Sequence, residues 1–131
     1  MVDYEDSAEH STLVTAIEGG INYWADVIEY RWDRPDWFAT VVEREDDGHT
    51  EPGQVVYMLD KEKIRDGMRA LCEPLSDKVK AGSLTDRTRR CLLGYVANDF
   101  KFGDRDYISY LDADVADVVV QYSLFGENVY G

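Results

Sequence analysis

Pro35 separates two different patterns of apolar side chains, and this change limits the folds open to the chain. Before it, large apolar residues recur at intervals of four, four, three and four, which places them on one face of a helix. They are Leu13, Ile17, Ile21, Trp24 and Ile28. Because proline disfavours helical geometry at the preceding residue, this helix has to end before residues 33–36. After it, residues 37–44 are rich in aromatic and β-branched side chains and predict a strand.

A turn and a second strand follow this first strand. Residues 45–48 end in Asp47-Gly48, a strong hairpin signal, and residues 51–53 lengthen the connection. Residues 54–59 then predict another strand. The two strands are expected to form an antiparallel hairpin with a long acidic loop.

Three further helices are predicted, each behind a capping residue. Asp60, Thr85 and Asp112 precede apolar side chains at helical spacing, and Gly126 is the stop signal of the last helix. The side chains expected to face inward are Ile64, Met68, Leu71, Leu75 and Val79 in the first, Cys91, Leu92, Tyr95 and Val96 in the second, and Val115, Val118, Val119 and Tyr122 in the third. The expected fold class is α+β, with about four helices packed with one antiparallel β-hairpin.

The start of the chain is acidic and lacks the basic and apolar regions of a secretory signal. The longest apolar run, residues 55–59, is far too short for a membrane span. We therefore expect a flexible acidic tail over residues 1–10, with Ser11 or Thr12 capping the first helix, a single compact domain over residues 11–131, and a cytoplasmic location. Cys72 and Cys91 lie within predicted helices and are expected to be reduced, packed thiols.

Negative charge dominates the composition and is unevenly distributed. The net charge is −13, and residues 1–60 hold 15 acidic side chains against three basic ones, whereas residues 61–100 are locally basic. Such a field repels nucleic acid over most of the surface and attracts cationic partners. We expect no direct nucleic-acid or membrane binding and a partner protein with a basic surface. The alternative is that the acidity only maintains solubility.

No motif for catalysis, a cofactor or a metal is present. The sequence has neither a phosphate-binding P-loop nor a dinucleotide-binding glycine pattern, and His10 and His49 lack metal-ligand spacing. The acidic residues around the last helix fit helix capping and the helix dipole better than a calcium loop. They are Asp104, Asp106, Asp112, Asp114 and Asp117. We therefore expect no metal, no cofactor and no catalytic residue.

Aromatic residues are concentrated between positions 23 and 38. Tyr23, Tyr30 and Trp32 fall outside the apolar stripe, and exposed tyrosine and tryptophan are typical of interface hot spots. They are candidates for an interaction surface, together with the acidic residues of the hairpin Glu43, Glu45, Asp46, Asp47 and Glu51. The alternative is that these rings pack between helix and hairpin.

Two further groups are candidates for binding a ligand. Gly19 and Gly20 interrupt the first predicted helix at about 1 kcal/mol each, so they require a kink, a break, or the close approach of another backbone or a ligand. Arg87, Arg89 and Arg90 lie near a predicted helix start, where an anion could bind. The alternative is that these arginines pair with acidic surface groups.

Two segments resemble sequences of a known group. Residues 18–24 (EGGINYW) and residues 112–131 (DADVADVVVQYSLFGENVYG) are similar to uncharacterised small acidic proteins encoded by bacteriophages and mobile elements, especially those of actinobacteria. The two segments make up about a fifth of the chain. The resemblance implies a phage-type setting, with the host-cell cytoplasm as the location, and implies no activity. A tail at Val129-Tyr130 that folds back onto the glycine pair would explain both segments at once.

Three hypotheses about function follow. The first is a non-enzymatic binding protein, a phage-type accessory factor that engages a host protein through an acidic surface bearing aromatic rings. The second is a protein that binds or sequesters a small nucleotide-like ligand, as an oligomer. The third is an enzyme that lacks recognisable motifs.

Overall fold

The computed structural model describes residues 7–44, 54–72, 86–127 and 129–130. Its elements, in chain order, are α1 (Ala8–Thr15), a π-helical turn η1 (Ala16–Gly20), β1 (Ala25–Arg31), β2 (Phe38–Glu43), β3 (Tyr57–Asp60), α2 (Lys61–Leu71), α3 (Asp86–Ala97), α4 (Asp104–Ser109) and α5 (Ala113–Phe125). The α+β class is confirmed.

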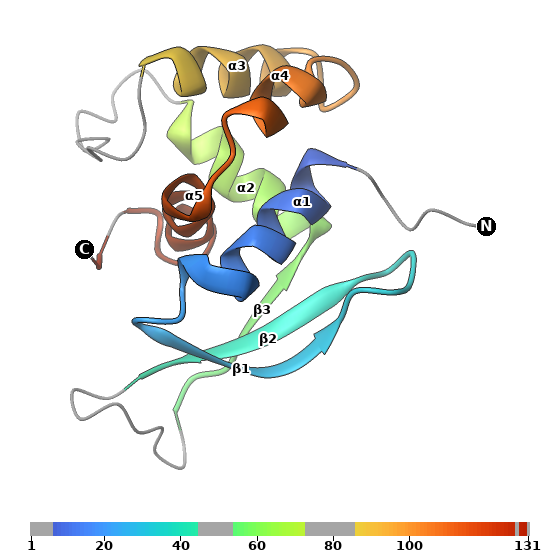
Figure 1. Cartoon of the computed structure of the whole chain (residues 1–131). Helices are drawn as coiled ribbons and strands as arrows, with labels where there is room; N and C mark the ends of the chain where they lie inside the picture. Colours follow the sequence, from blue (N-terminus) through green and yellow to red (C-terminus); the bar gives the residue numbers. More distant parts are fainter. Residues whose placement is uncertain (1–6, 45–53, 73–85, 128, 131) are drawn as a thin grey trace.

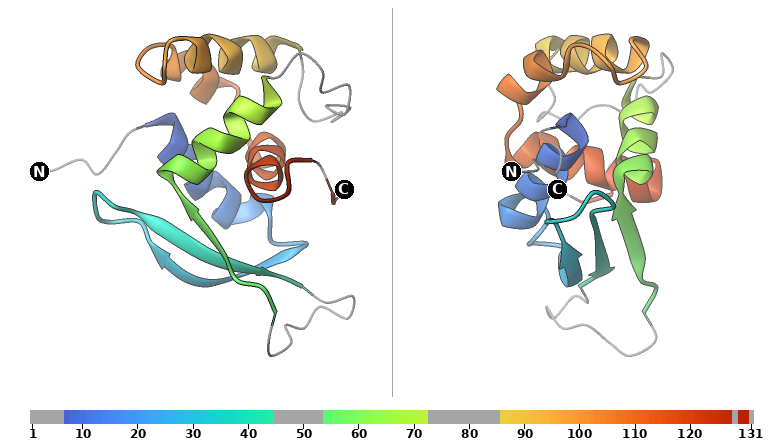
Figure 2. Two further views of the ribbon diagram at one scale, coloured as in Figure 1. Left: turned by 180° about the vertical axis from the view of Figure 1, so that it is seen from behind. Right: turned by 90° about the vertical axis from the view of Figure 1, so that its right-hand side faces the viewer.

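The three strands form one antiparallel sheet in the order β1-β2-β3. Figure 1 shows the sheet as one layer with the helices on the same side of it, and the views in Figure 2 agree. Helix α5 is the centre of the helical part, since every residue from Val115 to Ser123 is buried. It packs against α1, η1 and α2, while α3 and α4 lie at the end of the molecule farthest from the sheet.

The first helix differs from its prediction at both ends. It begins at Ala8 behind the cap Ser7, within the stretch expected to be a tail, and it ends at Gly20. Residues 25–31, expected to be helical, form the strand β1, and Ile28 is exposed instead of inward. Strand β2 supplies a hydrogen-bonding partner for this segment, whose Val27, Ile28 and Tyr30 favour an extended backbone. The predicted hairpin is therefore a three-stranded sheet.

Most of the remaining local predictions are confirmed. The side chains of Asp60 and Asp112 accept hydrogen bonds from the backbone of Lys63 and Val115, and so cap α2 and α5. Gly126 ends α5 with φ of 71°. The short helix α4 was not predicted. The predictions for Leu75, Val79 and Thr85 lie outside the described residues.

Close contacts between backbones explain one of the two unusual glycines. A Cβ atom on Gly20 would lie 2.8 Å from the carbonyl oxygen of Ala113, so η1 can approach α5 only because residue 20 has no side chain. A Cβ atom on Gly19 would meet nothing within 4 Å. Among the described helices, none is long and apolar enough to cross a membrane.

Candidate functional site

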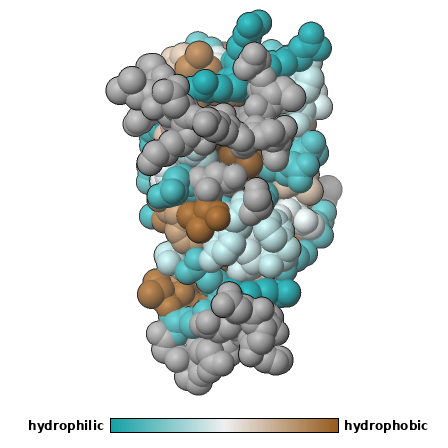
Figure 3. Space-filling model, turned by 90° about the vertical axis from the view of Figure 1, so that its left-hand side faces the viewer, coloured by the Kyte–Doolittle hydropathy of each residue, from teal (hydrophilic) through white to brown (hydrophobic). Residues whose placement is uncertain are grey.

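All helices of the described residues lie on one side of the sheet, so none of them covers its other face (Figures 1 and 2). On the helical side, Ala39, Val41 and Leu59 are completely buried. Because successive side chains of a strand point to opposite faces, Phe38, Thr40 and Met58 belong to the other face. Thr40 and Met58 are paired across β2 and β3, and Met58 keeps 49% of its surface exposed. Figure 3, which shows one side of the molecule, has hydrophobic surface in separate patches among hydrophilic side chains.

A group of apolar and acidic side chains lies at the end of the sheet where β1 ends and β2 begins. We call it the acidic corner and define it as Trp32, Asp36, Phe38, Met58, Asp60 and Glu62. The strand register brings Phe38 beside Asp60, and every member except Trp32 lines one pocket. Trp32 comes directly after Arg31, the residue of β1 that pairs with Phe38. Trp32, which follows β1, has 55% of its surface exposed. Exposed tryptophan beside a turn is the kind of anchor that protein interfaces use.

An open pocket of about 350 Å³ forms part of the acidic corner. Its apolar lining comes from Pro35, Trp37, Phe38 and Met58, and its charged lining from Asp36, Asp60, Lys61 and Glu62. The volume is at the lower end of the range for ligand pockets, and three carboxylates against one ammonium group favour a cationic occupant.

Ion pairs in this region leave an excess of carboxylates. Arg34 donates to both oxygens of Asp36 at 2.6 and 2.7 Å, and these hydrogen bonds hold the pKa of Asp36 below its usual value. Glu62 pairs with Arg65 at 3.4 Å, Arg31 pairs with Glu29 at 3.1 Å, and Arg44 pairs with Asp26 at 2.8 Å. Of the three pocket carboxylates, Asp60 alone has no ion pair among the described residues, and it caps α2. Residues 16–44 and 54–65, which include the whole acidic corner, hold eight acidic side chains against six basic ones. The sheet side of the molecule is therefore net negative.

The three aromatic candidates do not form one surface, contrary to expectation. Tyr23 precedes β1 and Trp32 follows it, so the strand separates them, and half-buried Tyr30 packs against the core. Tyr23 is 54% exposed, but its hydroxyl group donates to Asp117 on α5 at 2.5 Å. Burial, followed by this bond to Asp117, raises the pKa of Tyr23. Only Trp32 of the three belongs to the acidic corner.

The acidic candidates are also divided. Glu43 is half-buried, and one of its carboxylate oxygens accepts a hydrogen bond from the hydroxyl group of Tyr130. It therefore helps to hold the chain together. Glu45, Asp46, Asp47 and Glu51 lie outside the described residues.

The segment Val129-Tyr130 folds back onto the domain, but not onto the glycine pair. The ring of Tyr130 stacks on Trp24 with centroids 5.0 Å apart and planes at 6°. The carbonyl oxygen of the Gln121 side chain accepts the backbone N–H groups of Val129 and Tyr130 at 2.8 and 2.7 Å. Gly20 instead faces Ala113. Gly20 and the segment Val129-Tyr130 contact different turns of α5. The prediction that one contact between the glycine pair and this segment explains both is therefore wrong.

The ligand candidates lie in separate parts of the molecule. Gly20 is buried against α5, next to the sheet, whereas Arg87, Arg89 and Arg90 lie on α3 at the far end (Figure 1). Arg89 donates to the backbone carbonyl of Leu71 at 3.2 Å, so it links α3 to α2. The glycines and arginines therefore do not form one ligand site.

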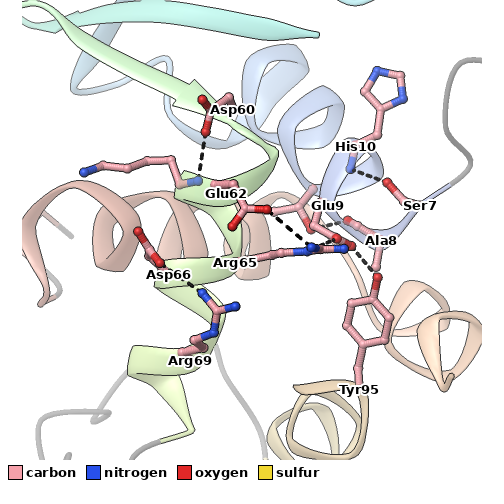
Figure 4. Close-up of polar contacts among 12 residues, drawn as sticks. Ser7, Ala8, Glu9, His10, Asp60, Glu62, Arg65, Asp66, Arg69 and Tyr95 are labelled. Atoms are coloured by element: carbon pink, nitrogen blue, oxygen red, sulfur yellow. Dashed lines mark hydrogen bonds and ion pairs between the residues drawn. The ribbon is translucent and has the colours of Figure 1, made fainter. Parts of the chain in front are cut away.

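Three helices meet at a buried polar cluster that no sequence pattern predicted (Figure 4). Glu9 has no exposed surface, and its carboxylate accepts from Arg65 at 2.7 Å and from the hydroxyl group of Tyr95. Burial opposes the charge on Arg65, but the bond to Glu9 raises its pKa overall. Both carboxylate oxygens are bonded, so the cluster joins α1, α2 and α3 structurally. No pattern in the sequence marks Glu9, because a glutamate is normally exposed.

Metal ligands and cysteine thiols are two further kinds of group that could carry chemistry. Within the described ranges, no group of three His, Cys, Asp or Glu side chains is placed to hold a metal ion. Cys72 and Cys91 are free and half-buried, and burial raises the pKa of Cys72 to about 11. Such a thiol is protonated near neutral pH and is a poor nucleophile.

Comparison with known proteins gives no relative for this chain: no family model, no curated protein and no solved structure matches it.

Proposed function

We propose that this chain is a non-enzymatic binding protein that engages a partner protein with a basic surface through the acidic corner. The observation that carries the proposal is the exposed Met58 in the lining of a pocket with three carboxylates, at the end of the sheet where the exposed Trp32 follows β1. Exposed aromatic and methionine side chains supply contact area, and carboxylates around them steer a cationic partner.

The charge of the whole chain supports a basic partner. A net charge of −13 raises the encounter rate with positively charged proteins and opposes association of the chain with itself. The resemblance to proteins of phages and mobile elements suggests that the partner is a protein of the bacterial host, which would make the chain a phage-type accessory factor.

A comparison of two double variants tests the proposal. Trp32→Ser with Met58→Ser removes the apolar anchors of the acidic corner, whereas Leu93→Ser with Phe102→Ser removes similarly exposed side chains at the far end of the molecule. Each protein is used to capture partners from a host lysate in low and in high salt. We expect one partner to be retained by the wild type and the far-end variant, to be lost with the corner variant, and to be released by salt.

Three results of this capture experiment would contradict the proposal. Retention of the partner by the corner variant would place the binding surface elsewhere. Retention that is indifferent to salt would remove the role of charge, and capture of nothing in low salt would remove the proposal itself.

A further inference from the structure

The sheet ends at two edge strands, and they differ in how well they could accept another strand. Strand β1 carries a bulge between Val27 and Glu29, and the charged side chains Glu29 and Arg31 follow it. Bulges and charges on an edge strand are the features that prevent pairing with other chains. The β1 edge is therefore protected.

Strand β3 has no bulge, and Asp60 at its end is the one charged residue among its four. Its pairing with β2 is regular from Tyr57 to Asp60, and β2 is its one neighbour in the described sheet. The residues leading into it, Val55 and Val56, are 65% and 55% exposed. Among the described residues, the backbone groups of Val55 and Val56 form no hydrogen bond with the backbone of a turn or loop. A regular, apolar edge of this kind is a template for an added strand.

The acidic corner lies at the end of this edge and indicates the side-chain chemistry of a segment that would pair with β3. A segment that continues alongside β3 reaches Asp60 and Glu62, with Phe38 and Met58 forming the apolar part of the pocket. A long basic side chain matches this lining, because its methylene groups can cover apolar surface while its charged end meets carboxylates. A second copy of this chain would instead bring another net charge of −13.

We infer that the partner adds an extended segment, with alternating apolar and basic residues, as a fourth strand along β3, and places a lysine or arginine in the pocket of the acidic corner. The inference rests on the proposed function and specifies the partner's chemistry and its mode of binding. Backbone hydrogen bonds would supply affinity, and the pocket would supply selectivity for the basic side chain.

Synthetic peptides test this mode of binding on the full chain. The probe is a capped peptide of alternating valine and arginine, and its twin carries a methyl group on every backbone nitrogen, which removes the N–H donors but keeps the charge. We expect the probe to bind, to slow amide hydrogen exchange in residues 55–60, and to bind at least about tenfold more tightly than the twin, which corresponds to about 1.4 kcal/mol.

Matched protein variants locate the peptide. Val56→Lys and Ile28→Lys add the same charge at similarly exposed positions on the two edges, and we expect only Val56→Lys to weaken probe binding beyond the shared effect of charge. Glu62→Gln should weaken binding several-fold, whereas Asp66→Asn, one turn further along α2, should not.

The outcomes separate this inference from the proposed function. Equal affinity of the probe and its methylated twin, or equal effects of Val56→Lys and Ile28→Lys, would overturn strand addition. If strand addition fails but retention of the lysate partner still requires Trp32 and Met58, the proposed function stands without strand addition. A probe with glutamate in place of arginine that binds equally well would overturn the assignment of a basic segment.

Discussion

Glu9 is a charged side chain with no exposed surface, and two different groups compensate for its burial. The guanidinium group of Arg65 and the hydroxyl group of Tyr95 each bond one carboxylate oxygen. Arg65 also lies over the ring of Phe100, 4.6 Å from its centroid, and Arg69 lies over the same ring at 4.9 Å. The carboxylate is tolerated in the core because it is fully bonded, and it joins three helices.

Glu9→Gln should therefore destabilise the protein strongly. The change leaves Arg65 without its buried counter-charge, and loss of one partner from such a pair costs about 3 kcal/mol. Asp66→Asn is the matched control, because its pair with Arg69 is exposed and contributes less than about 1 kcal/mol. Urea unfolding followed by circular dichroism measures both. Equal losses for the two variants would show that the buried cluster has no special weight.

At the scale of elements, α5 organises the helical part because other helices approach its backbone closely. Two glycines on different elements make this approach possible. Gly20 faces Ala113, and a Cβ atom on Gly67 of α2 would lie 2.6 Å from the carbonyl oxygen of Val119 and 2.8 Å from the nitrogen of Ser123. Neither contact leaves room for a methyl group, so the spacing of α2 and α5 depends on the absence of a side chain.

Gly67→Ala should lower the free energy of unfolding by about 1 to 3 kcal/mol, because the added methyl group forces α2 away from α5. Gly94→Ala on α3 is the control, since its Cβ atom would meet nothing within 4 Å. Alanine is the better helix former, so that variant should gain up to about 1 kcal/mol. Thermal unfolding of the two variants should shift in opposite directions. A stabilised Gly67→Ala would mean that the helices are not as close as described.

The molecule as a whole is polarised. The sheet end carries the acidic corner and a net negative charge, and the opposite end carries Arg87, Arg89 and Arg90 on α3 (Figure 1). The buried interior between them is rich in tyrosine. Burial raises the pKa of Tyr107, whose hydroxyl group pairs with Thr12 at 2.8 Å, and burial together with the bond to Glu9 raises the pKa of Tyr95.

These shifts predict that the protein loses stability in alkali. Unfolded tyrosines lose their protons near pH 10, whereas Tyr95 and Tyr107 keep theirs in the fold, so the folded state binds more protons above that pH. Raising the pH then favours unfolding by about 1.4 kcal/mol per pH unit for each such tyrosine. Urea titrations from about pH 9 to about pH 11 measure the slope. The slope should be smaller in the variant Tyr95→Phe with Tyr107→Phe, and an unchanged slope would contradict the assignment.

Local signals determined most of the elements of this protein. The caps Asp60 and Asp112, the stop at Gly126 and the apolar stripe of α2 each act within a few residues, so the sequence was sufficient to predict α2, α5 and the pairing of β2 with β3. The exposure of Trp32 was also predictable, because this residue lies outside the apolar stripe of the sequence.

Tertiary structure decided the rest, because the remaining features depend on partners distant in sequence. Residues 25–31 have the apolar spacing of a helix, but β2 supplies their hydrogen bonds and makes them a strand. The strand then separates Tyr23 from Trp32, and the sheet register brings Phe38 beside Asp60 to form the acidic corner. Glu9 is buried only because Arg65 and Tyr95 reach it from two other helices. The spacing of apolar residues indicates which of them share a face. Where that spacing is compatible with more than one backbone conformation, long-range hydrogen bonds and ion pairs decide which one forms.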